Sequence, residues 1–213
     1  MYNKFVKRML DILFSLMALP FFGVIFAVLA PLIVKEDKGP VFYNAPRLGK
    51  NKKIFKMYKF RSMRVNAPDL RNEDGSTYNG DEDPRVTKIG RFIRKTSLDE
   101  TPQILNILKG DMSLIGPRPD LPDALEVYQK GEDEKLKVRP GLTGYSQAYH
   151  RNSIDLHERF KQDVYYAKNV SFLLDVKIFF QTIKTVLLRK GVYRDEKGKK
   201  ITEKKAGRQN NAC

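Results

Sequence analysis

The chain contains very little cysteine and histidine. Its only cysteine is Cys213, the last of 213 residues, and its only histidines are His150 and His157. One cysteine excludes a disulfide framework and a cysteine-rich metal site, which is typical of proteins from a reducing cytosolic compartment. Two histidines argue against a histidine-rich zinc site. The sequence contains no internal repeat, and its length suits one folded unit with a substantial core.

Negative charge is also scarce. The chain has 40 lysines and arginines against 25 acidic residues, which gives a formal net charge of +15 and a pI near 9.8. This excess predicts an anionic partner, which is nucleic acid, anionic lipid headgroups or a phosphorylated substrate. Composition by itself does not choose among the three.

Charge is absent altogether from residues 12–34, ILFSLMALPFFGVIFAVLAPLIV. This run is as long as the ~20 residues that a helix needs to cross a bilayer core, so it predicts a membrane segment. A cleaved signal peptide is disfavoured, because Asp11 interrupts the basic lead-in and Pro31 follows the candidate cleavage site at Ala30.

The flanks of this run predict its topology. Basic residues lie on both sides of it: Lys4, Lys7, Arg8, Lys35 and Lys38. The positive-inside rule therefore favours a cytoplasmic location for both ends. Pro20 kinks the helix, because proline removes one backbone hydrogen bond and clashes with the preceding turn. A bent helix that enters and leaves one leaflet satisfies both observations, and a straight span is the alternative that composition leaves equally open.

Residues 40–64 predict a small β-hairpin. Basic and apolar side chains alternate on either side of Gly49-Lys50-Asn51, which is typical of a turn between two short strands. Two basic residues of the second strand, Lys59 and Arg61, either line an active site or contact lipid headgroups. The polar stretch 66–84 predicts a loop, in which the acidic run 81–83 is a solvated face.

The region 96–119 holds the residues most suited to chemistry. Asp99 and Glu100 are adjacent carboxylates, and Arg118 lies between Pro117 and Pro119, which stiffen the backbone around it. Two unit charges ~4 Å apart repel by about 4 kcal/mol at an intermediate dielectric, so an anionic nucleophile reaches phosphorus only when the charges are neutralised. A stiff guanidinium that binds phosphate in a bidentate manner, together with a metal on the carboxylates, would supply this neutralisation.

Structural interpretations of the same residues stay open. Ser97 with Glu100 fits a capping box that begins a helix, which would place the carboxylates at a helix amino end. Arg118 fits a turn in which the arginine pairs with a neighbouring acid. The glycine-containing loop 139–144 either approaches a nucleotide with its backbone or is an ordinary tight turn.

The remaining pattern is mostly helical. It predicts a basic amphipathic segment over 85–95, a helix that follows Pro102 and ends at Gly110, and a helix over 154–168. Residues 171–189 are apolar but carry charges, so we expect a helix against the core or in the bilayer interface rather than a second span. The lysine-rich tail from Gly191 lacks apolar periodicity, which predicts mobility.

Together these motifs resemble the bacterial sugar transferases, the small monotopic phosphoglycosyl transferases that begin lipid-linked glycan assembly. The resemblance covers nearly the whole chain and rests on residues 5–8, Asp11, residues 58–63 (YKFRSM), Asp99-Glu100, residues 109–119 (KGDMSLIGPRP), residues 139–144 (RPGLTG), Asp163, Tyr165 and Tyr166. It implies an α-rich α+β fold with a re-entrant helix kinked near Pro20 and with interfacial amphipathic helices. The implied parts are a membrane-inserted helix over 1–38, a catalytic domain over 39–190 facing the cytoplasm at the bacterial inner membrane, and a basic flexible tail over 191–213.

The resemblance also implies a reaction in two steps. Asp99 attacks the sugar-bearing phosphate of a UDP-sugar, releases UMP and becomes a phosphosugar intermediate, which undecaprenyl phosphate or a similar polyprenyl phosphate then attacks. Glu100, with Asp99 beside it, binds Mg²⁺. The implied substrate-binding residues are Lys59, Arg61, Arg118, Arg151 and Asp163. The implied partners are the two substrates and inner-leaflet phospholipids but no nucleic acid, and a homodimer is left open.

Two other classes of function remain open from the sequence. A basic, membrane-anchored binding protein would use the same apolar run and charge, but it would not require Asp99 and Glu100 to face Arg118. A direct glycosyl transferase would attack the sugar carbon and release UDP in place of UMP. The sequence does not name the sugar.

Overall fold

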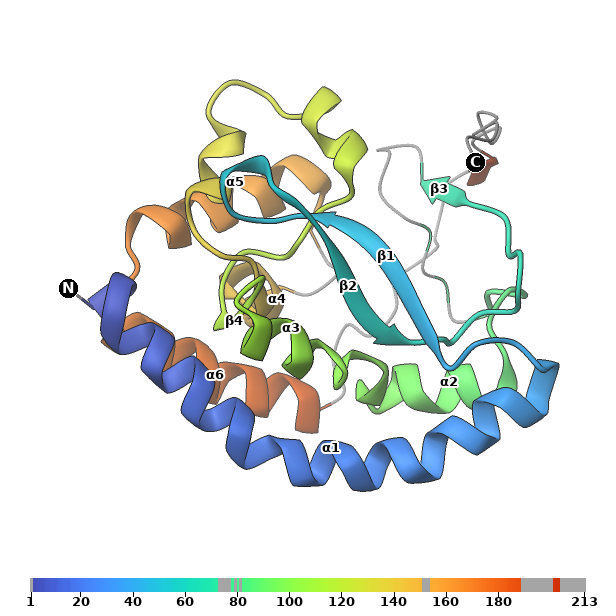
Figure 1. Ribbon diagram of the computed structural model, residues 1–213. Helices are drawn as coiled ribbons and strands as arrows, with labels where there is room; N and C mark the ends of the chain where they lie inside the picture. The colour runs from blue at the N-terminus through green and yellow to red at the C-terminus, as the bar shows by residue number, and fades with distance from the viewer. Residues whose placement is uncertain are drawn as a thin grey trace, which may run out of the picture.

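The computed structural model describes residues 2–72, 78, 80, 82–150, 154–188 and 201–203. Figure 1 shows α-helices arranged around a central hairpin. These α-helices are α1 (Lys7–Asp37), α2 (Lys88–Lys95), α3 (Gln103–Lys109), α4 (Tyr145–Tyr149), α5 (Leu156–Lys168) and α6 (Phe172–Leu187). Its strands are β1 (Phe42–Leu48), β2 (Ile54–Phe60), β3 (Leu70–Asn72), β4 (Ser113–Ile115), β5 (Gly141–Thr143) and β6 (Ile201–Glu203). The expected α-rich α+β fold is confirmed.

Helix α1 contains the uncharged run and extends beyond it at both ends. It has 31 residues, continues through Pro20 and Pro31, and ends where Lys38 takes a left-handed conformation with φ 56°. Figure 1 shows α1 curving along the lower edge of the molecule, with α6 near its amino-terminal half and α2 near its carboxyl-terminal half. Most apolar side chains in the middle of α1 are exposed, including Phe21 and Val24.

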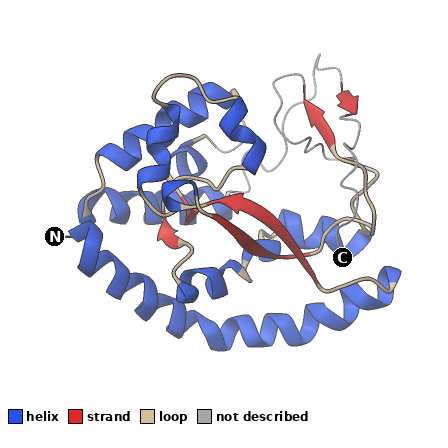
Figure 2. Ribbon diagram, turned by 45° about the horizontal axis from the view of Figure 1, so that its top comes forward, coloured by secondary structure: helices blue, strands red, loops and turns tan. Residues whose placement is uncertain are grey.

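Strands β1 and β2 form the predicted hairpin, which is the longest β element that the structure describes (Figure 2). They pair antiparallel from Phe42 opposite Phe60 to Leu48 opposite Ile54. Asn51 in the connecting turn is left-handed with φ 55°, a conformation that asparagine tolerates better than most residues. The turn thus forms where Gly49-Lys50-Asn51 predicts it.

A short parallel sheet explains the glycines of the 139–144 loop. Strands β4 and β5 pair in parallel, and Gly116 follows β4. A Cβ atom on Gly141 or Gly144 would come within 2.1 Å or 2.0 Å of backbone atoms of Gly116. These glycines therefore allow one backbone to approach another, and residues 141–143 form a strand in place of the tight turn that the sequence analysis left open.

Three apolar clusters join the helices to the strands. The first contains Leu29 and Ile33 of α1, Phe60 of β2 and Ile93 of α2. The second joins the hairpin to α3, and the third joins β4 to α4, α5 and α6. The carboxyl-terminal part of α1 is thus packed into the core of the domain.

Hydrogen bonds attach the amino-terminal end of α1 to the same domain. Arg8 donates to the carbonyls of Ile107 and Leu108 at 2.6 and 2.9 Å, where α3 ends. These carbonyls lie in the last turn of α3, where the helix dipole favours a cation. Asp11 accepts from the hydroxyl of Ser113 and the amide of Leu114 in β4, both at 3.0 Å.

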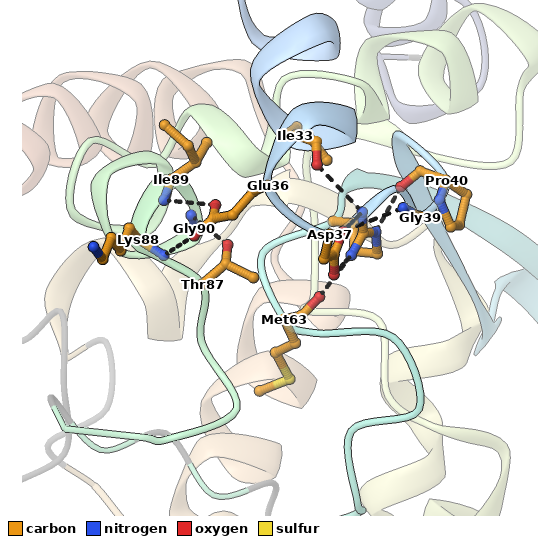
Figure 3. A network of polar contacts seen from close by, with 11 residues as sticks. Ile33, Glu36, Asp37, Gly39, Pro40, Met63, Thr87, Lys88, Ile89 and Gly90 are labelled. Carbon is orange, nitrogen blue, oxygen red and sulfur yellow. Dashed lines mark hydrogen bonds and ion pairs between the residues drawn. The ribbon is translucent and has the colours of Figure 1, made fainter.

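The carboxyl-terminal end of α1 is attached in a complementary way. Glu36 accepts from the amides of Lys88 and Ile89 at 2.6 and 3.1 Å, at the start of α2, so that an anion lies where the helix dipole favours one (Figure 3). Asp37 is paired with Arg61 of the segment that follows β2. One domain therefore binds both ends of the long apolar helix.

Candidate active site

The two adjacent carboxylates lie in a single 3₁₀ turn, Leu98–Glu100, between α2 and α3. Ser97 before the turn is left-handed with φ 59°, and its side chain makes no capping bond to the turn. The capping box expected from Ser97 and Glu100 is therefore wrong, because the left-handed backbone does not have the extended angles of a cap. Asp99 is only 4% exposed.

Lys59 of β2 contacts both carboxylates. Its Nζ atom lies 2.8 Å from Oδ2 of Asp99 and 3.3 Å from Oε1 of Glu100. Asn106 of α3 holds β2 in place just before Lys59, because it accepts from the amide of Tyr58 and donates to the carbonyl of Lys56, each at 2.8 Å. Sequence reasoning missed Asn106, since an asparagine inside a short helix gives no signal of a partner 48 residues away.

Arg118 also approaches Glu100. Its Nη1 atom lies 3.8 Å from Oε1 of Glu100, and its side chain is 42% exposed. The backbone before it is fixed, since Gly116 donates to Thr143 and Gly141 donates to Pro117 at 2.8 and 2.9 Å. The structure thus brings Asp99, Glu100, Lys59 and Arg118 together, as the sequence predicts.

These four side chains line one cleft with a volume of about 1950 Å³. Small-molecule sites commonly measure about 300–1,000 Å³, so the cleft has room for a nucleotide sugar together with part of a second ligand. Its walls also include apolar residues of two helices, among them Phe14 of α1 and Phe179 of α6. A ligand with both phosphate and apolar parts would find matching surfaces in it.

The carboxylates suit a metal that phosphate helps to hold. Among the described residues, no group of three or more histidine, cysteine or acidic side chains converges as a metal cage. Mg²⁺, however, is commonly bound by one or two carboxylates together with substrate phosphates. Asp99 and Glu100 fit that donor set.

Two expected substrate contacts have other partners. Arg61 is buried, and its guanidinium binds Asp37 and the carbonyl of Pro40 at the end of α1. Asp163 is fully buried and binds Lys135 and the hydroxyl of Ser146. Arg61 nevertheless lines the same cleft as the two carboxylates. The roles of Arg61 and Asp163 as substrate ligands stay predictions.

Two further expectations from the sequence concern Arg151 and the acidic run 81–83. Arg151 lies outside the described residues, so its role in substrate binding stays a prediction, as does the mobility of the tail. The acidic run 81–83 is not simply a solvated face, because Asp83 is fully buried and paired with Arg85 at 2.7 Å. Burial raises the pKa of the Asp83 carboxyl, but the bonds and charge of Arg85 outweigh it and lower that pKa.

A buried charge cluster lies next to Arg118 in the chain. Asp120 binds Lys135 at 2.7 Å, Arg159 at 3.2 Å and the hydroxyl of Tyr128 at 2.8 Å. Burial raises the pKa of Asp120, but the charges of Lys135 and Arg159 outweigh it, so that the pKa lies below its ordinary value. Lys135 had no signal in the sequence, since it lies in a polar run that is typical of an exposed helix.

Comparison with known proteins identifies the family to which this geometry corresponds. Residues 2–189 match the family model described as bacterial sugar transferase. An undecaprenyl-phosphate galactose phosphotransferase of Salmonella typhimurium is 42% identical over 208 residues, which is 90% of this chain and 42% of the relative. An N-acetylgalactosaminephosphotransferase of Aeromonas hydrophila, named for UDP-N-acetylgalactosamine and undecaprenyl phosphate, is 41% identical over 86% of this chain and 44% of its own length.

The chain thus spans less than half of these two relatives. It spans 88% of the exopolysaccharide production protein ExoY of Sinorhizobium fredii, to which it is 39% identical over 88% of its own length.

Proposed function

This chain belongs to the bacterial sugar transferase family, and we propose that it moves a sugar-1-phosphate from a UDP-sugar to a polyprenyl phosphate and releases UMP. One observation carries the proposal: the buried carboxylate of Asp99 lies within 2.8 Å of Lys59 in a cleft that Arg118 also lines. The names of the relatives, which include UDP-sugar and undecaprenyl-phosphate transferases, support the same substrates.

In the first step, a carboxylate oxygen of Asp99 attacks the phosphorus that carries the sugar. The bond from that phosphorus to the oxygen of the UMP moiety breaks, and UMP leaves with the electron pair. Lys59 and Arg118 neutralise the phosphate oxygens during the approach, which lowers the electrostatic barrier between two anions. Lys59 reaches Asp99 already and so lies where that charge would be needed.

In the second step, an oxygen of the polyprenyl phosphate attacks the same phosphorus. The bond to the Asp99 carboxylate breaks, so that the enzyme is restored and the sugar leaves on a diphosphate-linked lipid. Splitting the transfer into two displacements lets one cleft use the same cations twice, first for the leaving UMP and then for the incoming lipid phosphate.

We assign Mg²⁺ binding to Glu100, with Asp99 beside it. When bound, the ion would withdraw charge from the phosphate oxygens. The adjacent carboxylates supply the hard oxygen ligands that Mg²⁺ prefers. Glu100→Gln should raise the Mg²⁺ concentration needed for half-maximal UMP release, whereas an unchanged dependence would contradict this assignment.

The arrangement of α1 supports a re-entrant helix at the cytoplasmic membrane. At 1.5 Å per residue its 31 residues measure ~46 Å, more than the ~30 Å of a bilayer core. A straight span would separate its two ends by the whole membrane, yet one domain binds both Arg8 and Glu36. We therefore place both ends on the cytoplasmic side, where the positive-inside rule puts the basic flanks.

Helix α6 would lie in the same interface. Its exposed apolar side chains are Phe172, Leu173, Phe179, Phe180, Ile183, Val186 and Leu187. A salt bridge from Lys7 to Asp175 and a ring contact from Tyr2 to Phe172 join its start to the start of α1. Inner-leaflet phospholipids would cover these faces of both helices.

Product analysis tests the proposal. Detergent-solubilised protein is incubated with a panel of UDP-sugars and polyprenyl phosphate, and UMP, UDP and lipid-linked product are measured. We expect UMP and a lipid diphosphate sugar from at least one donor. Release of UDP would indicate direct glycosyl transfer, and binding without any turnover would indicate a binding protein. The molecular mass at which the purified protein elutes, that of one chain or that of two, decides whether it forms a homodimer.

A further inference from the structure

Three buried charges and the partly exposed Arg159 form a cluster beside the segment that carries Arg118. Lys135 is 1% exposed and lies 2.7 Å from Asp120 and 2.5 Å from Asp163. Arg159 is the second partner of Asp120, at 3.2 Å, and the hydroxyl of Ser146 donates to Asp163 at 2.7 Å. Two carboxylates and two cations balance, so the cluster carries no net charge.

Such a cluster is a poor way to gain stability. Removing charges from water is energetically costly, and apolar side chains of similar volume often replace buried ion pairs without loss of stability. What an ion cluster supplies instead is direction, since its hydrogen bonds fix the atoms that carry the charges. The question is which atoms this cluster fixes.

Asp120 of this cluster is separated from Arg118 by only one residue, Pro119. The backbone before Arg118 is held by β5 through Gly116 and Pro117, and the backbone after it is held at Asp120, whose carbonyl accepts from Leu48 at 2.8 Å. The Asp120 side chain adds the contacts to Lys135, Arg159 and Tyr128. Arg118 is thus the exposed side chain of a segment that is fixed on both sides.

We infer that Asp120 and Lys135 are positioning residues for Arg118, and that Asp163 acts with them by holding Lys135. The cluster fixes the chain on the far side of Pro119 and so directs the guanidinium toward Glu100 and the phosphates of the substrate. This inference rests on the proposed function, in which Arg118 binds phosphate. It replaces the substrate contact that the sequence predicts for Asp163 with a contact that acts through Lys135.

A double-mutant cycle separates positioning from general stability. Asp120→Asn keeps the shape and the backbone bond but weakens the hold on Lys135 and Arg159. In the otherwise unmodified chain we expect kcat/KM for the UDP-sugar to fall by ~10-fold. In an Arg118→Ala background, assayed with proportionally more enzyme, the same change should cost less than ~2-fold. An equal loss in both backgrounds would overturn the inference.

A milder pair of variants covers the case in which Asp120→Asn fails to fold. Tyr128→Phe removes only a hydroxyl that donates to Asp120, and Tyr2→Phe removes a hydroxyl that donates to another buried carboxylate, Asp175, at 2.6 Å. We expect Tyr128→Phe to lower kcat/KM by ~3-fold in a manner that Arg118→Ala abolishes. Tyr2→Phe should keep kcat/KM within ~2-fold. Equal effects of the two variants would contradict a role specific to Arg118.

Failure of the proposed function and failure of the positioning role give different results. If the unmodified chain releases no UMP from any UDP-sugar in the presence of polyprenyl phosphate, the proposed function is wrong. If it releases UMP and the cycle is additive, the function stands and the positioning role of Asp120 and Lys135 is wrong.

Discussion

Lys59 and Asp99 form an ion pair of 2.8 Å across the gap between β2 and the 3₁₀ turn. The lysine side chain is 21% exposed, and that of the carboxylate is 5% exposed. The ammonium group of Lys59 can therefore exchange its contact with Asp99 for a contact with an arriving phosphate without a large movement.

The first prediction follows from this pair. Lys59→Met should lower kcat by ~100-fold, as expected for the loss of one preorganised charge at the reacting group. Lys56→Met is the matched control, because Lys56 is an exposed lysine of the same strand, and it should keep its activity. Steady-state UMP release by the two purified variants makes the comparison, and equal rates would remove Lys59 from the mechanism.

The second prediction concerns the shape of the cation at position 118. Arg118→Lys keeps the charge but loses the bidentate fork, so kcat/KM should fall by ~10- to 100-fold, which corresponds to ~1.4–3 kcal/mol. Arg118→Ala should be worse. Arg91→Lys, on the exposed side of α2, serves as the control. Full activity of Arg118→Lys at both limiting and saturating UDP-sugar would mean that the proline-flanked segment is only a structural turn.

The third prediction separates two roles for Arg61. Its guanidinium is buried against Asp37, so Arg61→Met should lower the free energy of unfolding by about 3 kcal/mol by leaving that carboxylate without its partner. Below the unfolding temperature, KM for the UDP-sugar should stay near the unmodified value. Thermal unfolding in detergent and donor titrations measure the two effects. A normal unfolding temperature with a large rise in KM would restore the substrate contact expected from the sequence.

The fourth prediction tests the membrane topology. In a Cys213→Ser background, cysteines at positions 3 and 38 should both resist a membrane-impermeant maleimide added to intact bacterial cells and react after permeabilisation. Pro20→Leu should favour a straight helix and expose position 3, because it restores the backbone bond that proline removes. Labelling of position 3 from outside the cell in the chain with Pro20 would refute the re-entrant helix.

Local patterns in the sequence account for most of the elements. The uncharged run predicts α1, the turn residues Gly49–Asn51 predict the hairpin, and Gly110 ends α3 with the left-handed φ of 95° typical of that position. The carboxylates and Arg118 also come together as predicted, since the distinctive proline-flanked arginine gave a chemical signal.

Long-range ion pairs could not be predicted in the same way. A charged residue has the same letter whether it lies in water or in a buried pair, so the sequence does not reveal that Arg61 and Asp163 form buried ion pairs. Their actual partners, Asp37 and Lys135, lie 24 and 28 residues away. Only the packing of α1, β2 and α5 in three dimensions decides which charges meet.

The most direct test of the central claim is formation of the covalent intermediate without an acceptor. Purified protein is mixed with Mg²⁺ and the UDP-sugar that supports turnover, in the absence of polyprenyl phosphate, and UMP, the intact protein mass and the masses of its proteolytic peptides are measured. We expect one equivalent of UMP and a mass increase of one sugar phosphate on the peptide that contains Asp99. Asp99→Asn, which keeps the shape of the side chain and loses the nucleophile, should show neither while it remains folded. Near-normal UMP release by Asp99→Asn would contradict the account.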